Sequence, residues 1–219
     1  MNTLVVFGRA PEAGSGKSRL RSLVGSDLVD RLYEAFVADI LGWDLPTATS
    51  LVVALSGAVD GVRALAPSAH CVAQAEVGFG ERIRAGFDAA FELGAERVVM
   101  VGTDCPTLPA AAVDACFSRL AGHRATLVPA VDGGWVALGL DAPLGDTLDD
   151  VPWSSDQTGA ATRAALDRAG RPPALVEPWY DVDDADGLER LCRDLRGPGR
   201  RTAARRAPRT AAVVAAMSP

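Results

Sequence analysis

The sequence contains only two histidines, His70 and His123, among its 219 residues. Neither stands in a context typical of a catalytic base, and we interpret both as surface or strand-end residues. Enzymes built on a Ser-His-Asp or Cys-His arrangement need such a histidine, so the sequence argues against these classes. The scarcity of histidine favours chemistry by positioning and electrostatics, which is how phosphoryl-type transfers proceed.

Cysteines and long apolar runs are also scarce. None of the four cysteines pairs with another at C-x-x-C spacing, which argues against zinc and redox motifs. Scattered thiols fit a reducing cytosol. No stretch approaches the roughly 20 apolar residues of a membrane span, and the N-terminus lacks the basic segment of a signal peptide. We therefore expect a cytoplasmic protein without a membrane span.

Positive charge is concentrated at the C-terminal end of the chain. The 22 Lys and Arg residues face 28 Asp and Glu residues, for a formal net charge of -6. Residues 196–219 hold no acidic residue and six of the arginines, so residues 1–195 are more acidic than the whole chain. An acidic body argues against nucleic acid as a partner. Excess carboxylates suit a site for a divalent cation.

The length and the hydrophobic content of 48% suit one α/β domain. Apolar patterns predict strands alternating with helices, which indicates a mostly parallel sheet. Ser26 or Asp27 is the expected N-cap of the first helix. The predicted strands are 4–7, 51–55, 71–73, 98–101, 126–129, 135–140 and 175–176, of which 126–129 and 135–140 form an antiparallel pair, and the predicted helices are 25–42, 59–65, 78–93, 109–120, 158–169 and 184–195.

Two domain-level units are expected. Residues 1–195 form the folded domain, and residues 196–219, which are rich in Arg, Ala, Pro and Gly without apolar periodicity, form a disordered tail. The alternative for the tail is a basic arm that contacts anionic partners.

The first strand leads into a loop that is rich in glycine and positive charge. The loop and the residues just after it contain Gly8, Gly14 and Gly16, together with the cations Arg9, Lys17 and Arg19. Glycines let the backbone turn its N–H groups inward to form an anion site, and cations add charge-assisted hydrogen bonds. The loop is therefore interpreted as a phosphate-binding cradle at the edge of the sheet.

Two other interpretations of this loop remain open. Gly16-Lys17-Ser18 matches the end of a P-loop, but the first glycine of that motif would fall on Pro11. Proline has no N–H group to offer a phosphate, which argues against the P-loop. The second alternative is a flexible glycine loop whose charges are solvated.

Carboxylates follow two separate apolar stretches. Asp104 comes directly after the buried strand 98–101, where a carboxylate at the sheet edge can hold Mg²⁺. Asp181 and Asp183 alternate on an extended segment, so both can face the same ion. Asp184 or Asp186 would then supply negative charge to the start of the next helix. The alternatives are a turn or N-cap role for Asp104, and caps or solvated surface for the other four.

Two further groups of residues are candidates for substrate contact. Asp132-Gly133-Gly134 lets the backbone approach a ligand closely, and Asp132 can bind a sugar or acceptor hydroxyl, although a simple glycine hairpin is the alternative. Gln74 ends a predicted strand and can contact a base or ribose. Arg82 is grouped with it, with a structural salt bridge as the alternative.

The spacing of Phe7, Arg9, Pro11, Gly14 and the Lys17-Ser18-Arg19-Leu20 block resembles the F-x-[KR]-x-P-x-x-G-x-x-K-[TS]-R-L opening of a family of nucleotide-diphospho-sugar transferases. These proteins are often described as glycosyltransferases of unknown specificity. The resemblance extends over about residues 3–195. The family is also similar to guanylyltransferases and cytidylyltransferases that activate small phosphorylated acids. The later matching blocks are Gln74 with Gly80-Glu81-Arg82, Gly102-Thr103-Asp104-Cys105-Pro106, Pro129 with Asp132-Gly133-Gly134, Trp153-Ser154, and Asp181-Val182-Asp183.

The resemblance implies a GT-A-like domain, a Rossmann-type three-layer sandwich with a mostly parallel mixed sheet, which binds a nucleotide and Mg²⁺ or Mn²⁺. It implies that Asp104 is the first metal ligand and Asp183 or Asp181 the second. The catalytic residues it implies are Arg9, Lys17, Arg19 and Asp104; the nucleotide-binding residues are Phe7, Gly8, Arg9, Gly14, Lys17, Gln74, Gly80, Arg82 and Thr103; the acceptor-binding residues are Asp132, Gly133, Gly134 and Trp153. The chain departs from the family pattern at Gly16, where a bulkier residue is common, and at Trp135, where tyrosine is frequent.

These observations favour nucleotidyl transfer from an NTP to a small phosphorylated or oxyanion acceptor, with release of pyrophosphate. Three cations near one loop support this hypothesis, because a pyrophosphate leaving group needs more positive charge than an NDP-sugar does. A glycosyltransferase that uses an NDP-sugar is the alternative, and a nucleotide-binding module without turnover is the third. The base preference, the acceptor, and whether the chain forms a homodimer stay open.

Overall fold

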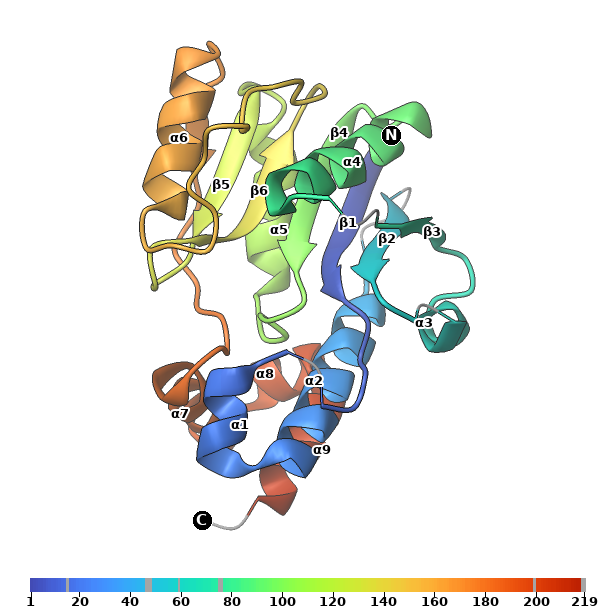
Figure 1. The fold of residues 1–219 in the computed structure, drawn as a ribbon, viewed down its shortest axis with the longest axis vertical. Coiled ribbons are helices and arrows are strands. Elements are labelled where there is room, and N and C mark those ends of the chain that lie inside the picture. Colours follow the sequence, from blue (N-terminus) through green and yellow to red (C-terminus); the bar gives the residue numbers. More distant parts are fainter. Residues whose placement is uncertain (15, 46–48, 59, 75–76, 199, 218–219) are drawn as a thin grey trace.

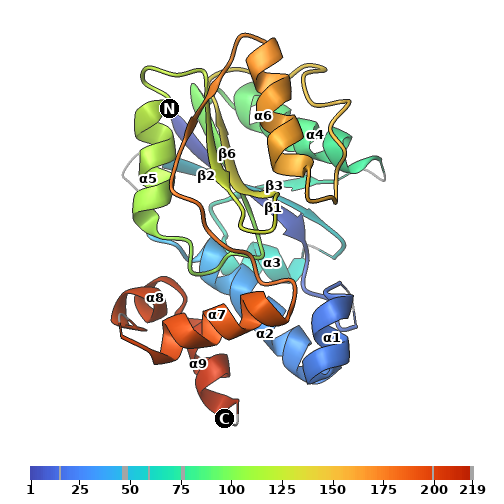
Figure 2. The ribbon, with the colours of Figure 1, turned by 90° about the vertical axis from the view of Figure 1, so that its left-hand side faces the viewer.

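The computed structural model describes residues 1–14, 16–45, 49–58, 60–74, 77–198 and 200–217. Within these ranges the chain forms one mixed sheet with helices on both faces (Figures 1 and 2). No helix in these ranges combines the length and the apolar character that crossing a bilayer requires. The elements are β1 (Asn2–Arg9), α1 (Ser18–Val24), α2 (Ser26–Leu41), β2 (Thr49–Ser56), α3 (Asp60–Leu65), β3 (His70–Ala73), α4 (Phe79–Glu92), β4 (Arg97–Gly102), α5 (Ala110–Arg119), β5 (Ala125–Pro129), β6 (Trp135–Leu140), α6 (Thr158–Arg168), β7 (Pro173–Leu175), α7 (Ala185–Arg196), α8 (Arg200–Arg206) and α9 (Pro208–Ala216).

The strand order is β3-β2-β1-β4-β6-β5-β7. β6 runs antiparallel to β4 and β5, and the other neighbouring strands pair in parallel. Leu4–Val6 in β1 and Val98–Val101 in β4 are fully buried, because helices cover both faces of the central strands. The expected α/β sandwich with a mostly parallel mixed sheet is confirmed, and so is the antiparallel pair of β5 and β6.

Apolar side chains form one core on each face of the sheet. Phe36 of α2, Phe117 of α5 and Leu191 of α7 belong to the first core. Phe87 of α4 and Leu166 of α6 belong to the second. Figure 2 shows α5 on one side of the strands and α4 with α6 on the other. Val59, the expected first residue of the predicted helix 59–65, lies outside the described residues.

The C-terminal segment is helical where the sequence predicted a disordered tail. Figure 1 shows α8 and α9 beside α2 and α7. The carboxylate of Asp39, which is fully buried in α2, accepts hydrogen bonds from the backbone N–H groups of Arg209 (3.0 Å) and Thr210 (2.8 Å) at the start of α9. Val214 packs into the first core. The folded unit therefore extends well past residue 195.

One arginine of this segment, Arg206, makes contacts within the folded protein. The guanidinium of Arg206 lies 3.6 Å from the centre of the Trp43 ring, and its Nε donates to the Leu108 carbonyl at 2.9 Å. Burial lowers the pKa of Arg206 to about 10. These contacts use one of the cations that the basic-arm alternative would present to an external partner.

Two local predictions at the N-terminal end differ from the structure. The sequence pattern gave no helix for α1 (Ser18–Val24). The N-cap of α2 is Gly25 rather than Ser26 or Asp27. Gly25 has φ +87, a conformation that favours glycine, and it joins α1 directly to α2.

The carboxyl ends of the parallel strands define the edge where the site forms. β1 and β4 are neighbours in the sheet, yet β2 and β3 separate them in the sequence and lie on the far side of β1. This change of direction is a topological switch point, which leaves a crevice between the loops that follow the two strands. β6, being antiparallel, begins at the same edge with Trp135.

The Asp39 contact predicts the stability role of the C-terminal helices. We expect Asp39→Ala to lower the free energy of unfolding by about 1–3 kcal/mol, because the N–H groups of Arg209 and the buried Thr210 lose their acceptor. Chemical denaturation measures the change. Glu34→Ala, at an exposed position of the same helix, is the control and should change stability by less than about 0.5 kcal/mol. Equal stability of the two variants would contradict this account of α9.

Candidate active site

A cleft of about 630 Å³ opens at the switch point. Its walls come from the end of β1, the loop after β4, the start of β6, and the segments 153–158 and 181–183. Among the predicted site residues the lining includes Phe7, Gly8, Lys17, Arg19, Thr103, Asp104, Asp132, Gly134, Trp153, Asp181 and Asp183. The structure therefore brings most of the expected donor, metal and acceptor residues to one place.

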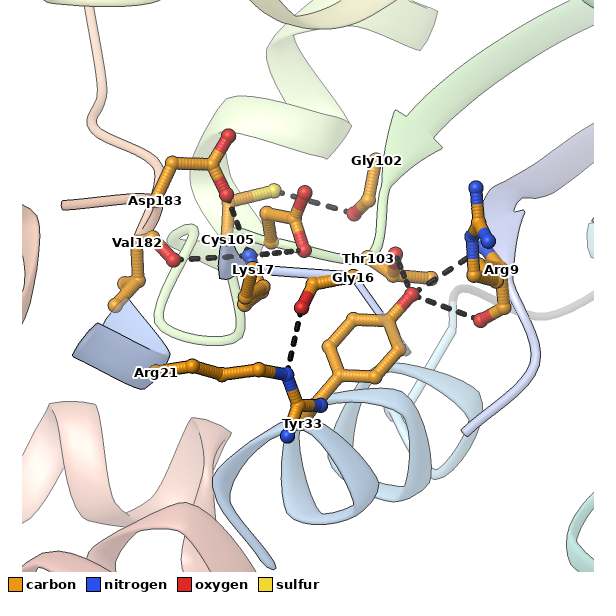
Figure 3. Close-up of polar contacts among 11 residues, drawn as sticks. Arg9, Gly16, Lys17, Arg21, Tyr33, Gly102, Thr103, Cys105, Val182 and Asp183 are labelled. Carbon is orange, nitrogen blue, oxygen red and sulfur yellow. Dashed lines mark hydrogen bonds and ion pairs between the residues drawn. The ribbon is translucent and has the colours of Figure 1, made fainter. Parts of the chain in front are cut away.

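Lys17 joins the two carboxylates expected to bind metal. Its Nζ lies 2.7 Å from Asp104 Oδ1. It lies 2.5 Å from Asp183 Oδ1 and donates to the Val182 carbonyl at 2.9 Å (Figure 3). The Lys17 side chain is 6% exposed, whereas those of Asp104 and Asp183 are 36% and 48% exposed. Burial alone would lower the pKa of Lys17, but the charges of Asp104 and Asp183 outweigh it and raise the pKa above its ordinary value.

Backbone contacts hold the two carboxylates next to each other. The Val182 N–H group donates to the Asp104 carbonyl at 2.9 Å. Upstream, the Trp179 N–H group donates to the Pro129 carbonyl at 2.9 Å, so the segment before α7 runs along the end of β5. Asp184 accepts from the Gly187 N–H group at 2.9 Å as the N-cap of α7, as one of the two alternatives for that helix predicted. The carboxylates thus reach the cleft from a strand end and a helix start.

The wall between β1 and β4 depends on a close approach. A Cβ atom at Gly8 would lie 2.2 Å from Thr103 Oγ1, so only glycine fits there. The Tyr33 hydroxyl of α2 lies 2.9 Å from Thr103 Oγ1, accepts from the Arg9 N–H group at 3.2 Å and donates to the Arg9 carbonyl at 2.8 Å. Tyr33 carries no signal of this role in the sequence beyond lying on the buried face of the predicted helix.

The loop after β1 contributes less to the cleft than expected. Arg9 and Gly14 are not among the lining residues, and the Gly14 N–H group donates to the Asp30 carboxylate, 3.1 Å from Oδ2. Arg21 forms an ion pair with the same carboxylate at 2.5 Å. Asp30 therefore takes the place that a phosphate would have at Gly14. Residue 15 lies outside the described residues.

The predicted group around Gln74 lies behind the cleft. Gln74 Nε2 donates to the carbonyls of Gly8 (3.2 Å) and Ala54 (2.5 Å), so it links the ends of β1 and β2. The Arg82 guanidinium lies 5.3 Å from the centre of the Phe79 ring and donates to Gln74 Oε1 at 3.3 Å. None of Gln74, Gly80 and Arg82 lines the cleft.

The predicted acceptor residues lie in the turn between β5 and β6 and at Trp153. Asp132 Oδ1 accepts from the Gly134 N–H group at 2.9 Å and closes the turn between β5 and β6. A Cβ atom at Gly133 would lie 2.2 Å from the Asp156 carbonyl, so the turn lies against the segment before α6. Gly133 itself does not line the cleft, whereas Asp132, Gly134 and Asp156 do.

Aromatic rings line part of the cleft. The ring centres are 5.5 Å apart for Phe7 and Phe79, 5.4 Å for Phe79 and Trp153, and 6.4 Å for Trp135 and Trp153. The Trp135 Nε1 atom is buried without a hydrogen-bond partner among the described residues. In the sequence Trp135 stands out only as a departure from the family pattern, and no motif points to Phe79. A Cβ atom at Gly80 would lie 2.5 Å from Trp153 Nε1, so Gly80 supports that ring from behind.

The oxygens at Lys17 fit a hard cation. Asp104, Asp183 and the Val182 carbonyl direct oxygen atoms at one point, and such ligands suit Mg²⁺ or Mn²⁺. In the described part of the chain, no three His, Cys, Asp or Glu side chains are arranged to hold a metal ion. Asp181 is therefore not placed to bind the same ion as Asp104 and Asp183. The cation at this point in the structure is the Lys17 ammonium.

Asp181 lies in an environment that disfavours its charge. Burial, with the neighbouring charges of Asp183, Asp132 and Asp104, raises the pKa of Asp181 to about 7. An unfolded chain would release this proton near pH 4. Between about pH 4 and about pH 7 the folded protein therefore binds a proton that the unfolded chain has lost, so stability falls as pH rises through that window.

This fall in stability with rising pH predicts how the melting temperature of Asp181→Asn depends on pH. In metal-free buffer, we expect the melting temperature of the wild type to fall more between about pH 5 and about pH 8 than that of the variant, because Asn carries no proton to lose. Asp186→Asn, at an exposed position in the first turn of α7, should fall as much as the wild type. The same pH dependence in Asp181→Asn and wild type would show that burial and the neighbouring charges do not raise the pKa of Asp181.

Comparisons with known proteins place the fold and the family. A solved structure from Desulfovibrio desulfuricans G20, provisionally named a nucleotide-diphospho-sugar transferase, matches with a TM-score of 0.82 and 27% identity over 98% of this chain and 96% of the other. A homologue of Mycobacterium tuberculosis Rv0371c from Mycobacterium sp. strain JC1 matches with a TM-score of 0.53 and 20% identity over 87% of this chain and 94% of the other. Bifunctional IspDF from Campylobacter jejuni matches with a TM-score of 0.51 and 10% identity over 86% of this chain and 53% of the other.

The first match covers nearly the whole chain, and it identifies the architecture as that of the nucleotide-diphospho-sugar transferases. No curated protein matched the sequence. The model of one protein family, described as uncharacterized proteins conserved in bacteria (DUF2064), matches residues 43–155, just over half of the chain. This protein therefore belongs to the DUF2064 family.

Proposed function

We propose that this protein is a divalent-metal-dependent transferase whose donor is a nucleotide. The observation that carries the proposal is the convergence of Asp104 and Asp183 on one cation position at the switch point of a nucleotide-diphospho-sugar transferase fold. Ligands of such sheets bind at this crevice. Asp104 and Asp183 would hold the ion, which would neutralise charge on the phosphates of the donor.

The positive charges in the cleft favour glycosyl transfer from an NDP-sugar. Of the three cations expected to face a triphosphate, Arg9 lies outside the cleft lining, and Lys17 can reach a phosphate only after its contacts with Asp104 and Asp183 break. Arg19 remains at the lining. An NTP together with a phosphorylated acceptor would bring more negative charge than an NDP-sugar with a hydroxyl acceptor.

Nucleotidyl transfer from an NTP to a small phosphorylated or oxyanion acceptor is the second candidate. Arg19 and Lys17 both border the cleft, so a rearranged loop would place two cations beside a triphosphate.

The aromatic and acidic residues of the lining support a neutral, hydroxyl-bearing acceptor. Trp135, Trp153 and Phe79 offer aromatic faces, and Asp132 and Asp156 offer carboxylates. Among the described lining residues, the only Lys and Arg are Lys17 and Arg19, and no His is present. Sugar-like rings have apolar faces that pack on aromatic rings and hydroxyls that donate to carboxylates. A phosphorylated acceptor would face like charges instead.

The buried Trp135 Nε1 adds a hydrogen-bond donor beside the ring of Trp153. An N–H group that is buried without a partner costs free energy, and an acceptor oxygen would satisfy it. The acceptor class that follows is a molecule that both donates and accepts hydrogen bonds around an apolar face.

A ligand screen tests the donor. We expect an NDP-sugar near a hundred times its dissociation constant to raise the melting temperature by about 5 °C or more, and only with Mn²⁺ or Mg²⁺ present. Asp104→Ala should fold but lose this shift, because it removes half of the cation site. Asp186→Ala should keep it. The second candidate predicts the same behaviour with an NTP.

Product analysis separates the reactions. Release of NDP without pyrophosphate, in the presence of metal and a panel of sugar-like and alcohol acceptors, supports glycosyl transfer. Pyrophosphate from an NTP would move the assignment to the second candidate. Binding of a donor with neither product across the panel would favour a nucleotide-binding module without turnover. Absence of any metal-dependent nucleotide binding would overturn the proposal.

A further inference from the structure

Lys17 is the only lysine of this protein. Every other cation among its 22 Lys and Arg residues is an arginine. The two side chains differ, because a guanidinium is a planar fork whereas an ammonium is a compact point charge with three donors. A compact point charge is the closer counterpart of a metal ion. The chain has therefore placed its one ammonium where its carboxylates converge.

The contacts of Lys17 surround its ammonium with oxygen atoms. Nζ donates hydrogen bonds to Asp183 Oδ1 and to the Val182 carbonyl, and it forms an ion pair with Asp104 Oδ1 at 2.7 Å. The rings of Tyr33 and Phe36 lie beside it, with centres 5.5 Å and 6.0 Å from Nζ. A phosphate would have to compete with these contacts for the ammonium.

The backbone at Lys17 is unusual for a residue with a side chain. It adopts φ 48 and ψ 43, the left-handed region, just before α1. For a non-glycine residue this conformation is disfavoured by about 1–2 kcal/mol. The ion pairs offset that cost in this state. A Lys17 that left the carboxylates would also allow its backbone to relax.

We propose that Asp104, Asp183 and the Val182 carbonyl form a single cation niche, which Lys17 fills in the metal-free protein and which a divalent ion enters only by displacing Lys17. The niche holds one cation because two positive charges cannot share the same two carboxylates without strong repulsion. The displaced ammonium then faces the cleft, where the phosphates of a donor are its natural partner.

This inference rests on the proposed function for the identity of the donor. Its consequence is that metal and nucleotide bind together. The metal alone must overcome the Lys17 ion pairs, whereas a nucleotide gives Lys17 new acceptors and lowers the cost of displacement. By reciprocity the metal strengthens nucleotide binding by the same factor.

Manganese binding to the metal-free protein tests the competition directly, with the spin-resonance signal of free Mn²⁺ as readout. We expect Lys17→Met to bind Mn²⁺ at least about tenfold more tightly than wild type, because the competing charge is gone. Arg19→Met removes an equal charge two residues away and at the same cleft, but outside the niche. It should change the affinity by less than about twofold, because an exposed charge is screened.

The wild-type protein offers a second measurement that does not depend on the folding of a variant. An amine-acylating reagent can modify only Lys17 and the α-amino group of Met1, and mass spectrometry separates the two products. In metal-free buffer Lys17 should react slowly, since its ammonium is buried and paired. Saturating Mn²⁺ should accelerate acylation of Lys17 at least about tenfold relative to Met1, and sodium chloride of equal ionic strength should not.

Equal Mn²⁺ affinity in wild type and Lys17→Met, or acylation of Lys17 that does not respond to Mn²⁺, would overturn the inference. So would the absence of Mn²⁺ binding in both proteins. Metal-dependent binding of an NDP-sugar could still be present in the first two cases, and the proposed function would then stand alone. Conversely, displacement of Lys17 by Mn²⁺ without any donor turnover would support the niche and leave the reaction to be reassigned.

Discussion

The ion pairs of Lys17 with Asp104 and Asp183 are the contact on which the site depends. They join three segments that lie far apart in the sequence: the loop after β1, the loop after β4 and the approach to α7 (Figure 3). A buried ammonium without these partners would be strongly unfavourable, and two adjacent carboxylates without a cation would repel each other. Each segment is therefore held in place by the charge of the others.

Close approaches between backbone segments give the cleft its shape around this contact. Gly8 lets the end of β1 meet Thr103, and Gly133 lets the β5–β6 turn meet Asp156. The sheet topology brings these turns to one edge. The result is a cleft whose lining combines the charged groups around Lys17 with the aromatic rings of Trp135 and Trp153. A donor with phosphates and an acceptor with a ring would meet between them.

The sequence predicted the sheet and the place of Asp104 at its carboxyl edge, because both follow from local patterns, whereas the pairing of Asp104 with Asp183 was implied by the family resemblance. Apolar runs such as Val98–Val101 mark buried strands, and a carboxylate just after such a strand must lie at the carboxyl edge. The partners of the loop cations were not predictable in this way. Lys17 and Gly14 bond to Asp183 and Asp30, which no local spacing connects to them. The same holds for α9, whose N-terminal N–H groups bond to Asp39 from the other end of the chain.

The position between Asp104 and Asp183 decides whether a divalent ion replaces the Lys17 ammonium. Diffraction from crystals of the protein grown with Mn²⁺ and an NDP, collected at the manganese absorption edge, locates the ion and the lysine together. The account predicts an anomalous peak between these two carboxylates, with Lys17 Nζ moved away from both and toward the phosphates. An anomalous peak elsewhere in the cleft, with Lys17 still bonded to Asp104 and Asp183, would contradict it.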